Sequence, residues 1–359
     1  MKYLMITANF APRGASPSIR TVNLVKALVA NGHEVHVLTY DEKTLTVYSE
    51  ADEEINKKIP SNVGITRIKG GWLRQLMVKL NTKRNLDHAT KIKHKYKGSL
   101  LATLLIPDPH IDACMTFIKH GKKLVESLRP DVIVTHGYPF SMHIVGYQLK
   151  KKYNELIWVA DYGDPWTGIP ISELLRPEWR KKLDYKIEKI LLSKVDLISL
   201  TTGATEKLYH NLFPSIYGKS CVIPMGFDKD DFKQINPISR NADLKDKYFI
   251  VHTGRVYNEA RDPYPFIKAI EFLIKENISM TAKIRVIFVG ELDIDITNYI
   301  NNSPSKEVFI IIPWVPVNES IAWMKTADLL LLLGNKGDIQ IPGKVYQYIG
   351  SQKPILMTL

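Results

Sequence analysis

The sequence of 359 residues contains only two cysteines, Cys114 and Cys221, which are far apart and lack metal-ligand spacing. This excludes a disulfide scaffold and a zinc ribbon, and is typical of a reducing compartment. No uncharged apolar run reaches the ~18 residues that a membrane-spanning helix needs. The apolar residues 1–10 precede Pro12 and Gly14 without a convincing cleavage site, so they predict a strand rather than a signal peptide. The sequence therefore predicts a cytoplasmic protein.

Acidic residues are also in short supply. Lys and Arg number 49 against 37 Asp and Glu, which gives a formal net charge of +12 and a pI of about 9.3. Residues 67–97 hold ten Lys or Arg and one acid, Asp87. Because apolar side chains such as Trp72 and Leu76 lie between the charges, this stretch predicts contact with an anionic membrane surface on the inner face of the cell membrane, or with a lipid-diphosphate acceptor. The alternative is a solvated basic face of an ordinary helix. No nucleic-acid recognition motif accompanies the charge, so no nucleic-acid partner is expected.

The domain organisation follows from apolar runs that alternate with helical patterns. The length suggests two domains, and the alternation predicts an α/β protein with two Rossmann-like, doubly wound parallel sheets. We expect a first domain at residues 1–226 and a second at residues 248–359. The polar stretch 227–247 has little periodicity and is interpreted as a linker. Facing strand ends would form a cleft, and ligands of open α/β sheets bind at the carboxyl ends of the strands.

The individual elements are most regular outside residues 41–130. The expected strands are residues 2–7, 34–39, 131–135, 157–161, 196–201, 221–225, 249–253, 285–289, 308–312, 329–333 and 355–358. Ser16 and Pro17 suit the start of the first helix, and Gly32 suits its end. Further helices are expected at residues 140–152, 178–193, 204–212, 263–275, 320–325 and 342–350.

The clearest candidate site follows the first strand of the second domain. Thr253, Gly254 and Arg255 come directly after this strand, and Arg261 lies six residues beyond Arg255. Glycine lets a ligand approach the backbone closely, and two arginines can hold a diphosphate through bidentate, charge-assisted hydrogen bonds. The alternative is an ordinary turn with two surface arginines.

Two further loops of the second domain are candidates at the same sheet edge. Pro342, Gly343 and Lys344 open the helix before the last strand, where free amides, the helix dipole and the lysine favour an anion. The alternative is a capped helix. Residues 313–316 follow another strand, and their backbone could read the edge of a nucleobase, with Trp314 packed nearby. The alternative there is a buried loop.

The first domain has three candidates, again after strands. Residues 12–14 suit a phosphate-facing turn at Gly14, although the G-x-G-x-x-G pattern is missing. His136 follows another strand, with a structural histidine as the alternative. Asp161 and Asp164 follow a buried strand, where carboxylates can orient acceptor hydroxyls or move a proton. An Asx turn is the alternative at Asp164.

Taken together, these motifs resemble the retaining glycosyltransferase family 4, which has the GT-B fold. The motifs that carry the resemblance are residues 253–261, 313–316, 327–329, 342–348 and 353–356. Residues 159–166 resemble the branch of that family that builds bacterial surface polysaccharides, including lipopolysaccharide and capsule. The resemblance covers nearly the whole chain and is weakest from about residue 41 to 130.

The resemblance implies a transferase that moves a sugar from a nucleotide-diphosphate sugar to a glycan or lipid-diphosphate-linked acceptor with retention. It implies that Arg255 and Arg261 hold the donor diphosphate, that Gly14 lies near the phosphates, and that His136 lies beside the transferred sugar. It also implies that the backbone of Val315 contacts the base. Asp161 and Asp164 remain catalytic candidates on the acceptor side.

The sequence departs from the family in two ways. Members often carry two glutamates eight positions apart, and those positions are Ile339 and Gln347 here, where Gln347 can still hydrogen-bond a ribose. Members usually continue beyond the apolar strand that ends at Leu359, so we expect a shortened second domain. A degenerate GT-B protein that binds a nucleotide or a partner transferase without turnover is therefore an alternative, as is a sugar-nucleotide epimerase.

No metal and no cofactor are expected. A D-x-D motif in a strand-end loop would suit a metal–diphosphate complex, and the sequence offers none there. The pair Asp293 and Asp295 has this spacing but falls at an expected helix start.

Overall fold

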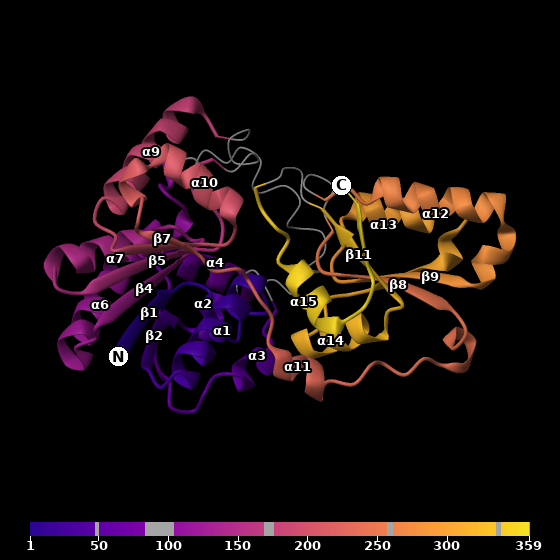
Figure 1. Cartoon of the computed structure of the whole chain (residues 1–359), viewed down its shortest axis with the longest axis horizontal. Coiled ribbons are helices and arrows are strands. Elements are labelled where there is room, and N and C mark those ends of the chain that lie inside the picture. Colours follow the sequence, from indigo (N-terminus) through magenta and orange to yellow (C-terminus); the bar gives the residue numbers. More distant parts are fainter. Residues whose placement is uncertain (47–49, 83–103, 169–175, 257–260, 335–338, 359) are drawn as a thin grey trace. The chain divides into compact units, whose positions relative to one another are not determined.

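The computed structural model describes residues 1–46, 50–82, 104–168, 176–256, 261–334 and 339–358. The chain divides into two compact units, of which the first extends to Met225 and the second begins at Gly226. Figure 1 shows that each unit is built on its own twisted sheet, with helices packed against the sheet. None of the described helices is both long enough and apolar enough to cross a membrane.

The first unit contains a seven-stranded sheet in the order β3-β2-β1-β4-β5-β6-β7, and all its neighbouring strands are parallel. Its strands are β1 (Lys2–Thr7), β2 (Glu34–Tyr40), β3 (Gly64–Ile68), β4 (Val132–Gly137), β5 (Ile157–Tyr162), β6 (Leu197–Leu200) and β7 (Ser220–Val222). The chain starts at the centre, winds outward to β3 and returns to β4. The carboxyl ends of all seven strands therefore meet at one edge.

Helices connect these strands and cover the sheet. They are α1 (Ser16–Ala30), α2 (Glu42–Leu45), α3 (Glu53–Lys57), α4 (Trp72–Thr82), α6 (Cys114–Leu128), α7 (Ser141–Lys152), α9 (Glu178–Leu192) and α10 (Gly203–Leu212), with the 3-10 turns η2 (Pro109–Ala113) and η3 (Pro214–Ile216). Pro17 lies in the first turn of α1, and Gly32 follows its end with φ +77°. Strand β4 is buried along its whole length, which explains its continuous apolar sequence.

The region from residue 41 to 130 is more structured than its sequence pattern suggests. Its described residues contain β3, four helices and η2, and the sequence predicted none of these elements. Strand β3 is the edge strand, and four of its five residues are only partly buried. An edge strand of this kind needs no long apolar run, so its sequence carries little strand signal.

The second unit contains a five-stranded parallel sheet in the order β10-β9-β8-β11-β12. Its strands are β8 (Tyr248–Thr253), β9 (Ile284–Val289), β10 (Phe309–Ile312), β11 (Leu329–Leu333) and β12 (Ile355–Thr358). The strands expected in both units are confirmed, with ends shifted by no more than three residues. The second unit repeats the doubly wound plan, because its chain also starts at the central strand.

The helices of the second unit are α11 (Lys229–Gln234), α12 (Tyr264–Glu276), α13 (Ile294–Asn301), α14 (Val317–Thr326) and α15 (Lys344–Ser351), with the 3-10 turns η4 (Ala242–Leu244), η5 (Ile278–Ala282) and η6 (Lys306–Val308). The stretch 227–247, interpreted as a linker, is bonded to this unit. Lys325 Nζ donates to the carbonyl of Phe232 at 2.8 Å, and Arg240 forms an ion pair with Asp328 at 2.9 Å. These bonds make the stretch part of the packing of the second unit.

Candidate active site

The loops after β8 and β9 cross at very close range. Gly254 follows β8 with φ +123°, and Gly290 follows β9 with φ +135°. A Cβ atom on Gly290 would lie 2.5 Å from the carbonyl oxygen of Gly254, which is backbone and cannot move aside cheaply. Both positions therefore need glycine. Each has a positive φ that side chains disfavour, and at Gly290 a side chain would also collide with the backbone of Gly254. The crossing fixes the backbone at the carboxyl edge of the sheet.

Lys344 extends over this crossing from the first residue of α15. Gly343 holds the cap position of the helix, and Pro342 is buried before it. A Cβ atom on Gly254 would lie 3.4 Å from Lys344 Cε, so the lysine stem lies against the glycine. Lys344 Nζ reaches Ser320 Oγ at 3.5 Å and makes no ion pair within the described residues.

The charge of Lys344 is poorly compensated. Burial and the neighbouring guanidinium of Arg261 lower the pKa of its amine to about 8. Two cations thus approach each other beside the N-terminus of α15, which itself carries a partial positive charge. An anion placed here would meet positive potential from three sources.

The end of β8 is held rigidly beneath this position. The hydroxyl of Tyr348 accepts a hydrogen bond from the Thr253 amide at 2.9 Å and donates to the carbonyl of Leu331 at 3.2 Å. His252 Nδ1 donates to the same carbonyl at 3.0 Å, and its Nε2 is buried and has no hydrogen-bond partner among the described residues. Burial, assisted by the charges of Arg261 and Lys344, lowers the pKa of His252 to about 4. The histidine is therefore neutral at physiological pH and adds no further positive charge.

The remaining second-unit candidates lie around the same edge. Arg255 is about half exposed, and its Nε lies 3.6 Å from Glu291 in an ion pair of similar exposure. Val315 packs against the core cluster beside β10, just before α14. Gln347 is partly buried on α15 and makes no side-chain hydrogen bond within the described residues. Asp293 occupies the N-cap position of α13 without a side-chain cap bond, which confirms that the Asp293-x-Asp295 pair lies at a helix start.

In the first unit, His136 and Asp161 meet on neighbouring strands. His136 lies in β4 and Asp161 in β5, at positions that pair across the sheet. His136 Nδ1 lies 2.6 Å from Asp161 Oδ2, and both side chains are buried. An ionised carboxylate only accepts hydrogen bonds, so Nδ1 carries the proton of this bond. His136 Nε2 has no partner within the described residues.

Two other side chains complete this network, and sequence reasoning missed their role. Arg20 from α1 binds Asp161 with two nitrogens, at 3.1 and 2.6 Å, and Ser199 from β6 donates to Asp161 at 2.6 Å. Burial alone would raise the pKa of Asp161, but the bond from His136 and the charge of Arg20 hold this pKa well below its ordinary value. The sequence signal was a lone arginine close to the apolar face of α1, but nothing in it identified a partner 141 positions away.

Arg20 has a further attachment within the first unit. Its Nη1 donates to the carbonyls of Ile223 and Pro224, both at 3.1 Å. Those residues lie just before Gly226, where the chain leaves the unit with φ +66°. Arg20 therefore connects the histidine–aspartate pair to the end of the first unit.

The other first-unit candidates also follow strands. Gly14 lies after β1, and its amide donates to the carbonyl of Glu50 at 3.0 Å. Asp164 lies two residues beyond the end of β5 and is exposed. The nearby Trp166 is buried and stacks on Phe140 with ring centroids 5.2 Å apart. Gly14, His136, Asp161 and Asp164 thus share the carboxyl edge of the first sheet.

The basic stretch 67–97 is only partly described, because residues 83–97 lie outside the described residues, as do the side chains of Met77 and Leu80. Within it, Arg67 donates to the carbonyl of Ala11 at 2.9 Å, and Arg74 is buried against His110. Trp72 and Leu76 are exposed on α4, at 65% and 47%. Two of the expected membrane-facing cations therefore serve the interior of the unit instead.

Comparison with solved structures identifies the fold. No protein-family model and no curated protein matches the sequence. Solved structures do align with 99% of this chain. An E. coli structure described as trehalose-6-phosphate bound with UDP-2-fluoro glucose aligns over 84% of its own chain, at TM-score 0.64 and 13% identity. Sucrose-phosphate synthase from Thermosynechococcus elongatus aligns over 81% of its chain, at TM-score 0.61 and 15% identity.

A third structure is described as a putative UDP-N-acetylglucosamine 2-epimerase from Listeria monocytogenes. It aligns with 99% of this chain and 78% of its own, at TM-score 0.55 and 12% identity. Identities this low establish the fold alone. The two parallel-sheet domains predicted from the sequence are confirmed as a GT-B fold. The cleft expected between the domains stays a prediction.

Proposed function

We propose that this chain is a glycosyltransferase that takes its sugar from a nucleotide-diphosphate donor. The observation that carries the proposal is Lys344, a partly buried amine whose charged neighbour is a second cation, Arg261. The charge of Arg261 disfavours the charged form of Lys344, and an anion bound at the amine would offset that effect. A diphosphate suits this position because Gly254 has no side chain, so a ligand could approach its backbone closely beside Lys344.

The donor contacts follow from this arrangement. Lys344, Arg261 and the N-terminus of α15 would hold the diphosphate, and Arg255 would join them by exchanging its exposed partner Glu291 for phosphate oxygens. These groups would also stabilise the negative charge that develops when the diphosphate leaves. Further along the same edge, the backbone of Val315 would contact the base. Gln347 would hydrogen-bond the ribose, and Pro342 and Gly343 would shape the turn.

The transfer step exchanges two bonds at the anomeric carbon. The acceptor hydroxyl oxygen forms a bond to this carbon as the carbon–oxygen bond to the diphosphate breaks, and the hydroxyl proton leaves with the diphosphate oxygen. Attack on the face from which the diphosphate departs retains the anomeric configuration. No metal is needed in this proposal, because the cations of the protein neutralise the diphosphate.

The first unit would supply the acceptor side. His136 would lie beside the transferred sugar, with the orientation of its ring fixed by the hydrogen bond between Nδ1 and Asp161. Asp161 acts through His136, because its two oxygens already bind Arg20, Ser199 and the histidine. Asp164 is exposed and would contact acceptor hydroxyls directly, and Gly14 would lie near the donor phosphates.

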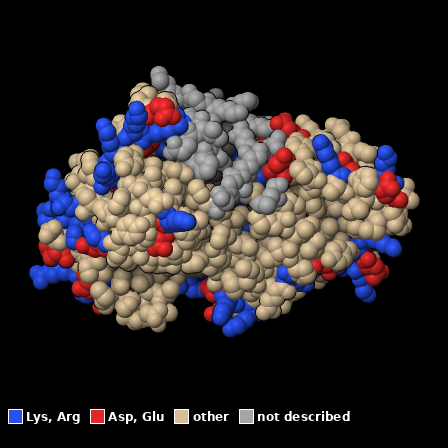
Figure 2. All heavy atoms as spheres, turned by 45° about the horizontal axis from the view of Figure 1, so that its top comes forward, with Lys and Arg blue, Asp and Glu red and all other residues tan. Residues whose placement is uncertain are grey.

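The acceptor we propose is a glycan or a lipid-diphosphate-linked sugar of bacterial surface polysaccharide synthesis. Exposed Trp72 and Leu76 on α4 support contact between the 67–97 stretch and an anionic membrane surface. Figure 2 shows Asp and Glu interspersed with Lys and Arg on the described residues of the side of the molecule that it draws. This mixture favours a protein without a nucleic-acid partner, because a nucleic-acid footprint is a continuous basic patch.

The test of the donor site uses matched lysine variants. Lys344→Met should weaken nucleotide-diphosphate binding strongly, whereas Lys283→Met should leave it unchanged, because Lys283 lies before β9 at the opposite edge of the sheet. Calorimetry on the full chain measures both. Equal affinities in the two variants would contradict the site.

One alternative function has an observation in its favour. Gln347 carries no charge where the resembled family often has a glutamate, which suits a protein that binds a nucleotide or a partner transferase without turnover. A sugar-nucleotide epimerase shares the fold. Product analysis separates the three, because a transferase consumes an acceptor, an epimerase converts the donor without one, and a binding protein converts neither.

A further inference from the structure

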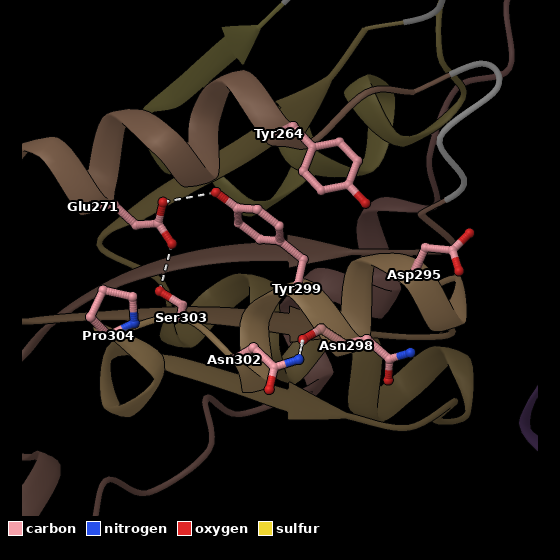
Figure 3. Close-up of a pocket in the computed structure, with 8 residues that line it drawn as sticks. All are labelled: Tyr264, Glu271, Asp295, Asn298, Tyr299, Asn302, Ser303 and Pro304. Carbon is pink, nitrogen blue, oxygen red and sulfur yellow. Dashed lines mark hydrogen bonds between the residues drawn. The ribbon is translucent and has the colours of Figure 1, made fainter.

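A groove lies in the second unit between α12 and α13 (Figure 3). Its volume is about 430 Å³, and it is lined by Tyr264, Glu271, Asp295, Asn298, Tyr299, Asn302, Ser303 and Pro304. Figure 3 shows Tyr264 and Asp295 toward one end and Glu271 and Pro304 toward the other. Tyr264 and Glu271 are seven residues apart on α12, which corresponds to about 10 Å along the helix. The groove is therefore elongated.

One end of the groove lies at the sheet edge that carries the donor loops. Helices α12 and α13 follow β8 and β9, so their first turns lie at the carboxyl edge of the sheet. Tyr264 comes three residues after Arg261, and Asp295 comes five residues after Gly290. The groove starts near the proposed diphosphate site and leads away from it along the helices.

The apolar part of the lining consists of two tyrosine rings. Tyr264 and Tyr299 are partly exposed and meet edge to face, with ring centroids 5.1 Å apart. Aromatic rings of this kind offer a rigid apolar face together with a polar hydroxyl. Such a surface suits a ligand that is itself apolar on one face and polar at its rim, as a sugar ring is.

The polar side chains of the lining are held by hydrogen bonds, and some of their polar atoms remain to bind a ligand. Glu271 accepts hydrogen bonds from the Tyr299 hydroxyl at 3.0 Å and from Ser303 Oγ at 2.5 Å, which fix its carboxylate. Asn302 Nδ2 donates to the backbone carbonyl of Asn298 at 2.9 Å, so its Oδ1 remains to accept. The side-chain amide of Asn298 is exposed and makes no hydrogen bond within the described residues.

Charge selects the class of ligand. The part of the lining that the structure describes holds two carboxylates, Glu271 and Asp295, and no Lys or Arg. A phosphate or another anion would be repelled, which distinguishes the groove from the cationic donor site. A neutral polyol suits the lining, because its hydroxyls donate to carboxylate and amide oxygens while its ring faces pack on the tyrosines.

We propose that this groove binds a neutral oligosaccharide, as a holding site for the glycan that the transferase extends. The inference rests on the proposed function for the role of the glycan. Binding the chain on the donor domain keeps the acceptor at high effective concentration, so that successive transfers do not each need a new encounter.

The test uses the full chain and a panel of neutral hexasaccharides with different linkages, namely maltohexaose, cellohexaose, laminarihexaose and isomaltohexaose. Saturation-transfer NMR and calorimetry at millimolar concentration detect binding. We expect at least one of them to bind, and Asn298→Ala to weaken that binding at least fivefold. Asn301→Ala is the matched control, because Asn301 is an exposed asparagine of the same helix outside the groove, and it should change affinity less than twofold.

Three outcomes would overturn the inference: no hexasaccharide binds, Asn298→Ala and Asn301→Ala behave alike, or hexalysine binds the groove in place of every saccharide. Nucleotide-diphosphate binding, measured on the same samples, separates this inference from the proposed function. Loss of saccharide binding with intact nucleotide binding removes the groove and leaves the transferase. Saccharide binding without any nucleotide response removes the transferase instead.

Discussion

The lowered pKa of Lys344, about 8, makes nucleotide binding depend on pH in a way that can be calculated. In the free protein the amine loses its proton as the pH rises through 8. A diphosphate bound against the amine stabilises its charged form, so the pKa of the bound state lies above that of the free state. The bound state therefore holds more protons, and affinity is complete below pH 8 and decreases above it. Between pH 7 and pH 9 the affinity should fall about tenfold.

The assay is calorimetric titration with UDP, GDP or ADP at pH 7, 8 and 9, in two buffers of different ionisation enthalpy. At pH 8, binding should take up about half a proton per site. The terminal phosphate of the ligand ionises near pH 6, so it contributes little over this range. Lys344→Met should bind weakly and take up no proton, whereas Lys283→Met should behave like the unmodified chain.

The result that would refute this reasoning is affinity that stays constant from pH 7 to pH 9 with no proton uptake. In that case Lys344 would not contact the diphosphate, whatever nucleotide the chain binds.

Three further predictions concern stability. Gly290→Ala places a Cβ atom 2.5 Å from a backbone oxygen and should lower the free energy of unfolding by well above ~1 kcal/mol. The control is Gly218→Ala, which should lower it by only ~1 kcal/mol, because Gly218 has φ +74° but open space around it. Urea unfolding of both variants measures the difference. Arg20→Met leaves the carboxylate of Asp161 buried without its cation, so the free energy of unfolding should fall by about 3–5 kcal/mol, and a loss below 1 kcal/mol would contradict the network. Burial raises the pKa of Glu188 to about 7, above its value in the unfolded chain. The stability that this group contributes is therefore lost as the pH rises through 7. In Glu188→Gln, the urea midpoint should change less between pH 5 and pH 8 than in the unmodified chain.

The sequence predicted most of the two sheets because buried parallel strands are continuous apolar runs. Strand β4 is buried throughout, and its apolar run predicted a strand at residues 131–135. Strand β3 lies at the edge, and the helices around it are mostly short, so residues 41–130 carried little periodic signal. Boundaries shifted by a few residues because helix and strand ends depend on caps and neighbouring chains rather than on periodicity.

For the candidate site, the sequence predicted where residues lie along the sheet edge, but not which residues contact one another. Gly254 and Lys344 could be singled out because each lies in a loop at the same edge of a parallel sheet. The need for Gly290 could not, because it arises from contact between two loops. Arg20 and Asp161 are 141 residues apart, and the periodicity of a sequence does not predict a contact over such a separation. The pair changes how Asp161 is interpreted, from a group that faces the acceptor to one that positions His136.

The central claim is that the second unit binds a nucleotide diphosphate through its own cations. The most direct measurement is titration of the full chain with UDP, GDP, ADP and their sugars in the presence of EDTA, with Arg255→Ala as the paired variant. The account predicts a response to one diphosphate without metal, and strong loss of that response in Arg255→Ala. A response to none of them, or equal affinity in the variant, would contradict it.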